Sequence, residues 1–179
     1  NAKRLDASKK VHFPVLERID ANRVRLDKVA ELFNQAVSSG ELELIDRAAE
    51  KSAEFGQAIT EIIELDAEKG ENFQRIGDEF AQFFTSGSTL SRGMVSGTLS
   101  ANEMKSAVAD TQEKMEKVRT SLQVSRKDSY EAFTHSLDEA KQKTNSGLLV
   151  SIVVSLMTAA VMLGSAVLVS KLIVSDITG

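Results

Sequence analysis

An uncharged apolar run near the C-terminal end constrains this chain more than any other feature of its sequence. Residues 147–169 read GLLVSIVVSLMTAAVMLGSAVLV, and the nearest charged residues are Lys143 before the run and Lys171 after it. Because a helix rises about 1.5 Å per residue, about 20 apolar residues cross the hydrocarbon core of a bilayer. We therefore predict a transmembrane helix over 147–169. Its position late in the chain differs from that of a cleaved signal peptide.

The residues before this run predict a single polar, helical domain over 1–146. The chain contains one proline, and its sequence lacks the strict alternation of half-buried strands, so long helices are the expected elements. The formal net charge is −4, which argues against a nucleic-acid partner. Residues 170–179 are expected to form a short segment on the far side of the membrane.

Four segments repeat apolar residues at alternating spacings of three and four, which is typical of helices that pack along a narrow seam. We expect these residues to form the core of an all-α domain. In the first two segments the seam positions are Val15, Ile19, Asn22, Leu26, Val29, Phe33 and Ala36, followed by Ile45, Ala48, Ser52, Phe55, Ile59 and Ile62. In the last two they are Phe73, Ile76, Phe80, Phe83, Leu90 and Met94, followed by Met104, Val108, Thr111, Met115, Val118 and Leu122.

Glycines and capping residues predict where these helices begin and end. Gly40 is expected to stop the first helix, and Ser38 with Glu41 fits a capping box that starts the second. A break at 69–70 separates the second helix from the third. Ser100 with Glu103 forms a better capping box for the fourth helix.

The fourth helix is expected to run unbroken from this box into the membrane. No strong helix breaker lies between Glu103 and Gly147, so its extramembrane part would be roughly 65 Å long. The predicted fold is an antiparallel, up-and-down four-helix bundle with long first and fourth helices. The second and third helices are shorter, and the hairpin that joins them lies short of the membrane.

This layout resembles the sensor domain of bacterial methyl-accepting chemotaxis receptors of the four-helix-bundle type. The resemblance covers the whole chain. The stretches that carry it are HFPVL at 12–16, AVSSGE at 36–41, EFAQFF at 79–84, GMVSG at 93–97, and SKLIV at 170–174 with ITG at 177–179, which look like the lead-in to a HAMP linker.

The resemblance implies a homodimer in the bacterial inner membrane, with the bundle in the periplasm. It also implies another membrane helix before Asn1 and a cytoplasmic signalling domain beyond Gly179. The implied ligand is a small molecule, or a periplasmic binding protein that carries one. In the implied mechanism, the ligand shifts the fourth helix by about 1–2 Å against the first.

Arginines near the middle of the first and fourth helices are the best candidates for ligand binding. If both helices leave the membrane near their outer ends, these residues lie at one level of the bundle. Arginine captures carboxylates in bidentate geometry, so an anionic ligand is expected. The predicted site residues are Arg18, Asn22, Arg23, Arg25, Arg119 and Arg126.

Each candidate has a structural alternative. Neighbouring acidic residues could neutralise the arginines and leave a solvated charged face. Asn22 within the seam could fix helix register, whereas a cavity lined by seam residues such as Thr111 would bind a ligand. His135 with Glu131 and Glu139, and with His12 at nearly the same height on the first helix, could form a metal or pH-sensing site, although a solvated helix face is the default.

The predicted function is that of a receptor input module without enzymatic activity or cofactors, because no catalytic arrangement of residues is present. Two alternatives remain. The same module could feed a sensor histidine kinase or a cyclase. Alternatively, the chain could be a structural helical bundle with a C-terminal membrane anchor.

Overall fold

The computed structural model of the chain describes residues 11–138. Residues 11–134 lie in one compact unit, and residues 135–138 belong to a second unit. The predicted transmembrane run and the segment after it lie outside the described residues. Within 11–138, none of the helices combines the length and hydrophobicity that a membrane span requires.

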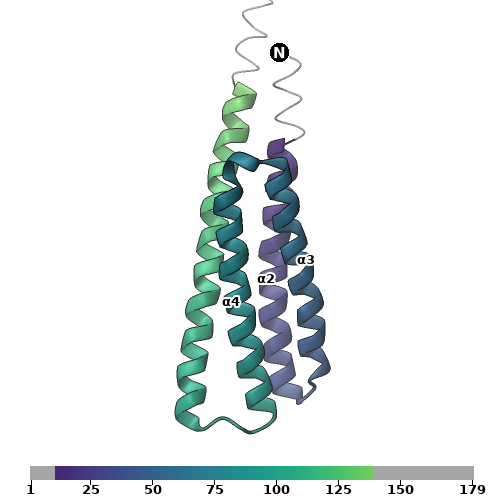
Figure 1. Cartoon of the computed structure of the whole chain (residues 1–179), viewed down its shortest axis with the longest axis vertical. Helices are drawn as coiled ribbons and strands as arrows, with labels where there is room; N and C mark the ends of the chain where they lie inside the picture. The colour runs from purple at the N-terminus through teal and green to yellow at the C-terminus, as the bar shows by residue number, and fades with distance from the viewer. Residues whose placement is uncertain (1–10, 139–179) are drawn as a thin grey trace, which may run out of the picture. The chain divides into compact units, whose positions relative to one another are not determined.

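The fold is an all-α bundle of four long helices (Figure 1). Helix α2 (Phe13–Ser39) is followed by α3 (Glu43–Leu65), a single 3₁₀ turn η2 (Ala67–Lys69) and α4 (Gly70–Val95). A further helix covers residues 101–138 and is called the last helix below. Successive helices run antiparallel, as the seam pattern predicted.

The predicted seams of α2 and α3 form most of the core. All seven predicted seam positions of α2 are buried, and Ser52 of α3 is the one predicted position there that is only half-buried. The rings of Phe55 and Phe80 stack at 3.7 Å between centroids, which joins α3 to α4. Burial of such aromatic rings is the largest single contribution that side chains make to a core of this kind.

Two of the predicted helix boundaries are confirmed in detail. Gly40 adopts a left-handed conformation with φ 77° and its N–H donates to the carbonyl of Ala36, which ends α2. At the start of the last helix, the Ser100 N–H donates to Glu103 Oε2 at 2.9 Å, and the Glu103 N–H donates to Ser100 Oγ at 3.4 Å. This is the reciprocal pair of a capping box.

The predicted capping box of Ser38 and Glu41 is wrong. Helix α3 begins at Glu43 without a side-chain cap. Ser38 lies within the last turn of α2, where its hydroxyl donates to the carbonyl of Asn34 at 2.8 Å. A serine inside a helix is bonded to the preceding turn and cannot cap the next helix.

The last helix has fewer buried apolar side chains than the others. In its described part, Val118 and Leu122 are the only fully buried hydrophobic residues, and Ser125 and Ser129 continue the same buried stripe. The predicted seam positions before Val118 are only half-buried. This helix is therefore held against the bundle by less apolar packing than α2 or α3.

Candidate functional site

Two of the predicted site residues of α2, Arg18 and Arg25, form an ion-pair ladder with carboxylates of α3. Arg18 Nε donates to Glu61 Oε2 at 2.7 Å, and Arg25 Nε donates to Glu54 Oε2 at 3.4 Å. The two pairs are seven residues apart on each helix, which is two turns. Both pairs are matched in this register of α2 against α3, although ion pairs as exposed as these contribute little stability.

A second ladder joins the opposite side of α2 to the last helix. Arg126 Nε donates to Asp20 Oδ1 at 2.7 Å, and Arg119 Nη2 donates to Asp27 Oδ1 at 2.8 Å. Arg23 also lies near Asp20, at 3.4 Å. The arginines of the last helix thus lie at the level of those of α2, as expected from the sequence.

The structure does not bring these arginines together into one pocket. Each residue turns the helix by about 100°, so a rotation of about 200° around α2 separates residue 20 from residue 18, and the two side chains point to nearly opposite sides. Arg18 and Arg25 consequently face carboxylates of α3, whereas Arg119 and Arg126 face carboxylates of α2.

Asn22 is fully buried in the seam between α2 and α3. Its Nδ2 donates to the carbonyl of Phe55 at 3.2 Å, and its Oδ1 accepts from Arg25 Nη1 at 2.9 Å. Its hydrogen-bonding partners are therefore internal, and they join two helices at a defined height. This arrangement is that of a residue that fixes register.

A groove of about 370 Å³ lies beside Arg18 and Arg25. It is also lined by Glu17, Glu54 and Glu61, so its carboxylates outnumber its guanidinium groups. The hydrogen bond from Arg18 lowers the pKa of Glu61, which keeps that carboxylate ionised. Binding of an anion here would require the arginines to leave these partners, and the role of the six predicted residues in ligand binding stays a prediction.

A larger cavity of about 690 Å³ lies between α2, α4 and the last helix, toward the end of the bundle where α2 and α4 finish. Its size falls within the range of small-molecule sites in proteins. Its apolar lining comes mainly from Phe33, Phe83, Leu90, Met94, Val108 and Met115.

The polar lining of this cavity includes one buried hydroxyl group without a partner. Thr111 Oγ1 makes no hydrogen bond to any described residue, although the atom is buried. Asn34, Ser38, Ser91 and Gln112 also line the cavity. Glu116, which is ion-paired with Arg119, is the one charged residue among the described lining residues. The cavity is therefore apolar in character and has no cationic lining.

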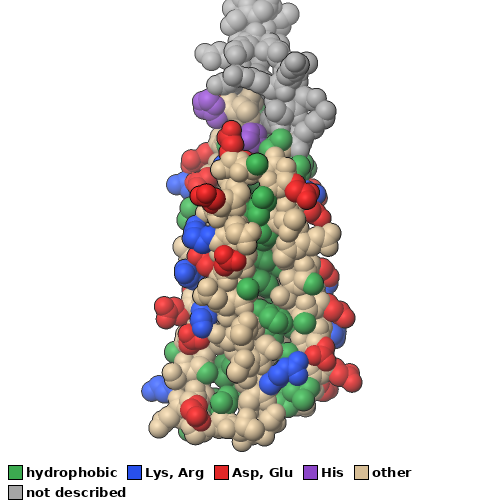
Figure 2. Space-filling model, in the orientation of Figure 1, with side chains coloured by type: hydrophobic (Ala, Val, Ile, Leu, Met, Phe, Trp, Pro, Cys, Tyr) green, Lys and Arg blue, Asp and Glu red, His purple; other side chains and the backbone are tan. Residues whose placement is uncertain are grey.

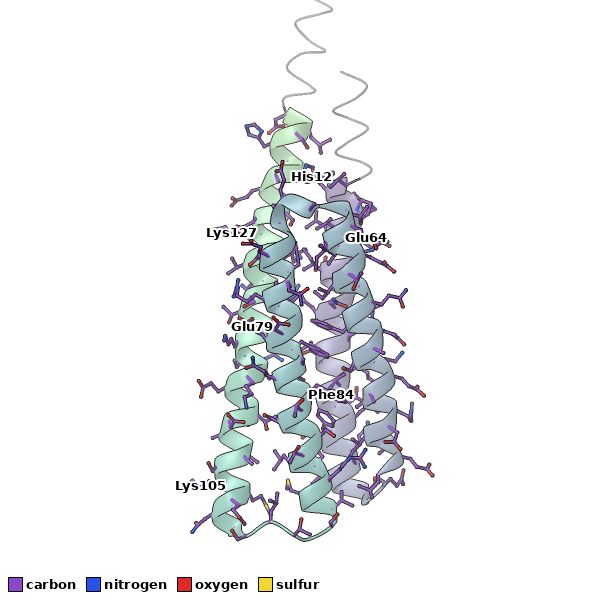
Figure 3. The ribbon with its side chains drawn as sticks, viewed as in Figure 1. His12, Glu64, Glu79, Phe84, Lys105 and Lys127 are labelled. Atoms are coloured by element: carbon purple, nitrogen blue, oxygen red, sulfur yellow. The ribbon has the colours of Figure 1, made fainter. Side chains whose placement is uncertain are left out.

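A polar seam joins α4 to the last helix beyond the cavity. Glu79 is 4% exposed, and its carboxylate accepts from Ser121 Oγ at 2.7 Å and from Arg75 Nη1 at 3.0 Å, with Lys117 Nζ at 3.6 Å. Figure 3 shows Glu79 on the side of α4 that faces the last helix. The cations around it offset the cost of burying its charge.

Two further contacts extend this seam at intervals of seven residues along α4. Asn72 Nδ2 donates to Ser125 Oγ at 2.8 Å, and Ser86 Oγ accepts from Lys114 Nζ at 2.7 Å. The sequence pattern did not reveal this seam, because polar residues at a helix interface look like exposed ones in a single sequence. The heptad spacing of Asn72, Glu79 and Ser86 was the available signal.

Charged side chains of both signs are mixed on the visible face of the part of the chain that the structure describes (Figure 2). In Figure 2, acidic and basic side chains are interspersed along the left edge of the visible face. The described residues contain no group of histidine, cysteine and acidic side chains that could hold a metal ion. Glu139, one of the residues considered with His135, lies outside the described part.

No protein-family model matches the chain, and comparisons with curated proteins and with solved structures likewise found no match. The proposal of a function thus depends on the sequence features given above and on the bundle and its sites.

Proposed function

We propose that this chain is the ligand-sensing input module of a transmembrane receptor of the chemotaxis class. The observation that carries the proposal is the weak apolar packing of the last helix. This helix precedes the apolar run at 147–169, and in its described part only Val118 and Leu122 are fully buried hydrophobic residues. Polar contacts also hold it to the bundle, through Glu79 and its neighbours and through the ion pairs of Arg119 and Arg126, and Met115 is a half-buried apolar contact with the core.

A helix held in this way is suited to transmit a signal. Polar and half-buried contacts can be exchanged for similar contacts after a small axial shift, whereas interlocked core side chains resist displacement. A ligand that binds more tightly to one position of the last helix would favour that position by its difference in affinity. The displacement would then pass along the helix to the membrane run and to a cytoplasmic domain beyond Gly179.

The wider setting follows the same proposal. The module would lie in the bacterial inner membrane as a homodimer, with residues 1–146 in the periplasm and residues 170–179 leading into a HAMP linker. It would have no enzymatic activity of its own. A histidine kinase or cyclase as the output domain is compatible with the same mechanism, whereas a purely structural anchor requires no movable helix.

The proposal can be tested in a hybrid receptor in which this chain replaces the input module of a chemoreceptor that controls a kinase. Val118→Ala removes one of the two apolar anchors of the last helix and should weaken its packing by about 2 kcal/mol. We expect the basal kinase activity to change several-fold. Val124→Ala is the matched control, because Val124 lies on the same helix and is 53% exposed.

The result that would overturn the proposal is equally specific. If Val118→Ala leaves the kinase activity at the level of Val124→Ala, while circular dichroism shows a weakened but folded bundle, the last helix does not control the output. The structural anchor would then be the better explanation.

A further inference from the structure

We propose that the cavity between α2, α4 and the last helix binds a neutral, largely apolar small molecule that carries one hydrogen-bonding group. The inference adds a ligand class to the proposed function. Binding itself does not depend on that function, whereas the effect of binding on a signalling output does. It also differs from the anionic ligand that the arginines suggested.

The lining of the cavity decides the charge of the ligand. No lysine or arginine is among the described residues that line it, and the one charged lining residue, Glu116, is acidic. An anion would lose its hydration without gaining a cationic partner, which is costly in an apolar site. A cation would have only Glu116, which is already paired with Arg119.

The shape of the lining favours a planar apolar molecule. Phe33 and Phe83, which both line the cavity, lie at 6.2 Å between ring centroids. Met94 and Met115 line the same cavity. Aromatic rings bind planar molecules by stacking or edge contacts, and methionine side chains adapt to different shapes.

Thr111 supplies the polar anchor. Its hydroxyl oxygen is buried and has no hydrogen-bond partner among the described residues, and a buried hydroxyl without a partner is unfavourable. The oxygen itself is covered in the structure, so a ligand with one N–H or O–H group could donate to it only after the Thr111 side chain turns towards the cavity. Because Thr111 lies on the last helix, a ligand held between it and Phe33 of α2 would contact both the movable helix and the fixed core.

Indole is a suitable probe, because it is planar, neutral and carries a single N–H group. The chain contains no tryptophan, so the fluorescence of added indole can be followed without background from the protein. The full chain would be reconstituted in lipid nanodiscs and titrated with indole, and empty nanodiscs would give the contribution of lipid partitioning. We expect saturable binding, with a blue shift of the indole emission.

Ligand analogues and variants test each part of the inference. Indene has the shape of indole without the N–H group and should bind more weakly, whereas indole-3-carboxylate should not bind. Thr111→Val should weaken indole binding by about two- to tenfold and leave indene binding unchanged. Thr120→Val, at an exposed position of the same helix, should have no effect.

A cavity-filling variant tests the location independently of Thr111. Ala30 lines the cavity, so Ala30→Leu fills part of it and should weaken binding of both indole and indene. Ala53→Leu makes the same change at an exposed position of α3 and should leave binding intact. Circular dichroism of each variant shows whether the bundle is folded.

Three results would overturn the inference: no saturable binding above that of empty nanodiscs, tighter binding of the carboxylate than of indole, or an unchanged affinity for indole and indene in a folded Ala30→Leu variant. Unchanged indole binding in Thr111→Val would overturn the role of the hydroxyl. Indole bound by the purified chain without an effect on the hybrid receptor would leave the site standing and count against the sensing function instead.

Discussion

Gly87 of α4 gives the most direct test of the packing around the cavity. A Cβ atom placed on Gly87 would lie 2.5 Å from Phe33 Cε2 and 2.7 Å from Phe33 Cδ2. These distances are far shorter than van der Waals contact, so Gly87→Ala forces the Phe33 ring to move. Overpacking of this kind costs about 1–3 kcal/mol.

The same substitution also brings a gain, which must be separated from this cost. Replacing glycine by alanine within a helix stabilises it by about 1 kcal/mol. Gly56 of α3 measures that gain alone, because a Cβ atom there meets nothing within 4 Å. We therefore expect Gly56→Ala to be stabilised by about 1 kcal/mol, and Gly87→Ala to range from unchanged to about 2 kcal/mol less stable than wild type.

The free energy of unfolding can be measured by urea titration, with the helical circular dichroism signal as the readout. An unchanged dependence on urea would indicate that the denatured states of the two variants are comparable. Equal stabilisation of Gly56→Ala and Gly87→Ala would refute the close packing of Phe33 on Gly87. The position of the cavity wall would then be wrong as well.

Two further predictions concern the interface between α2 and α3. Asn22→Ala should destabilise the bundle by about 2–3 kcal/mol, because it removes the hydrogen bonds to the Phe55 carbonyl and to Arg25. The bond to Arg25 is charge-assisted and therefore the stronger of the two. A loss of stability below about 1 kcal/mol in the same urea titration would contradict this prediction. The pKa of Glu61 is lowered from 4.5, first by the hydrogen bond from Arg18, so its contribution to stability is present above about pH 4.5 and is lost as the pH falls through the lowered value. Glu61→Gln should remove the loss of stability that protonation of Glu61 causes at low pH. Urea unfolding curves of wild type and variant, measured at several pH values between about 3 and 6, would reveal the difference.

The sequence alone determined the architecture of the bundle. Spacings of three and four in the apolar residues identify four helices, because a helix has 3.6 residues per turn and only one of its faces can meet the core. Gly40 and the Ser100–Glu103 pair marked two boundaries correctly, since both act through local backbone geometry. The box at Ser38 failed because the preceding helix continued through that residue.

The tertiary structure decided which partners the side chains found. The sequence predicted that the arginines lie at one level of the bundle. Because α2 packs between α3 and the last helix, Arg18 pairs with Glu61 of α3, whereas Arg126 pairs with Asp20 of α2. The cavity could not be predicted from the sequence either, because Val108 and Met115, which line it, follow the same spacing as the buried Val118. Periodicity shows which face of a helix points inward, whereas the distance between facing helices decides whether that face is packed or lines a cavity.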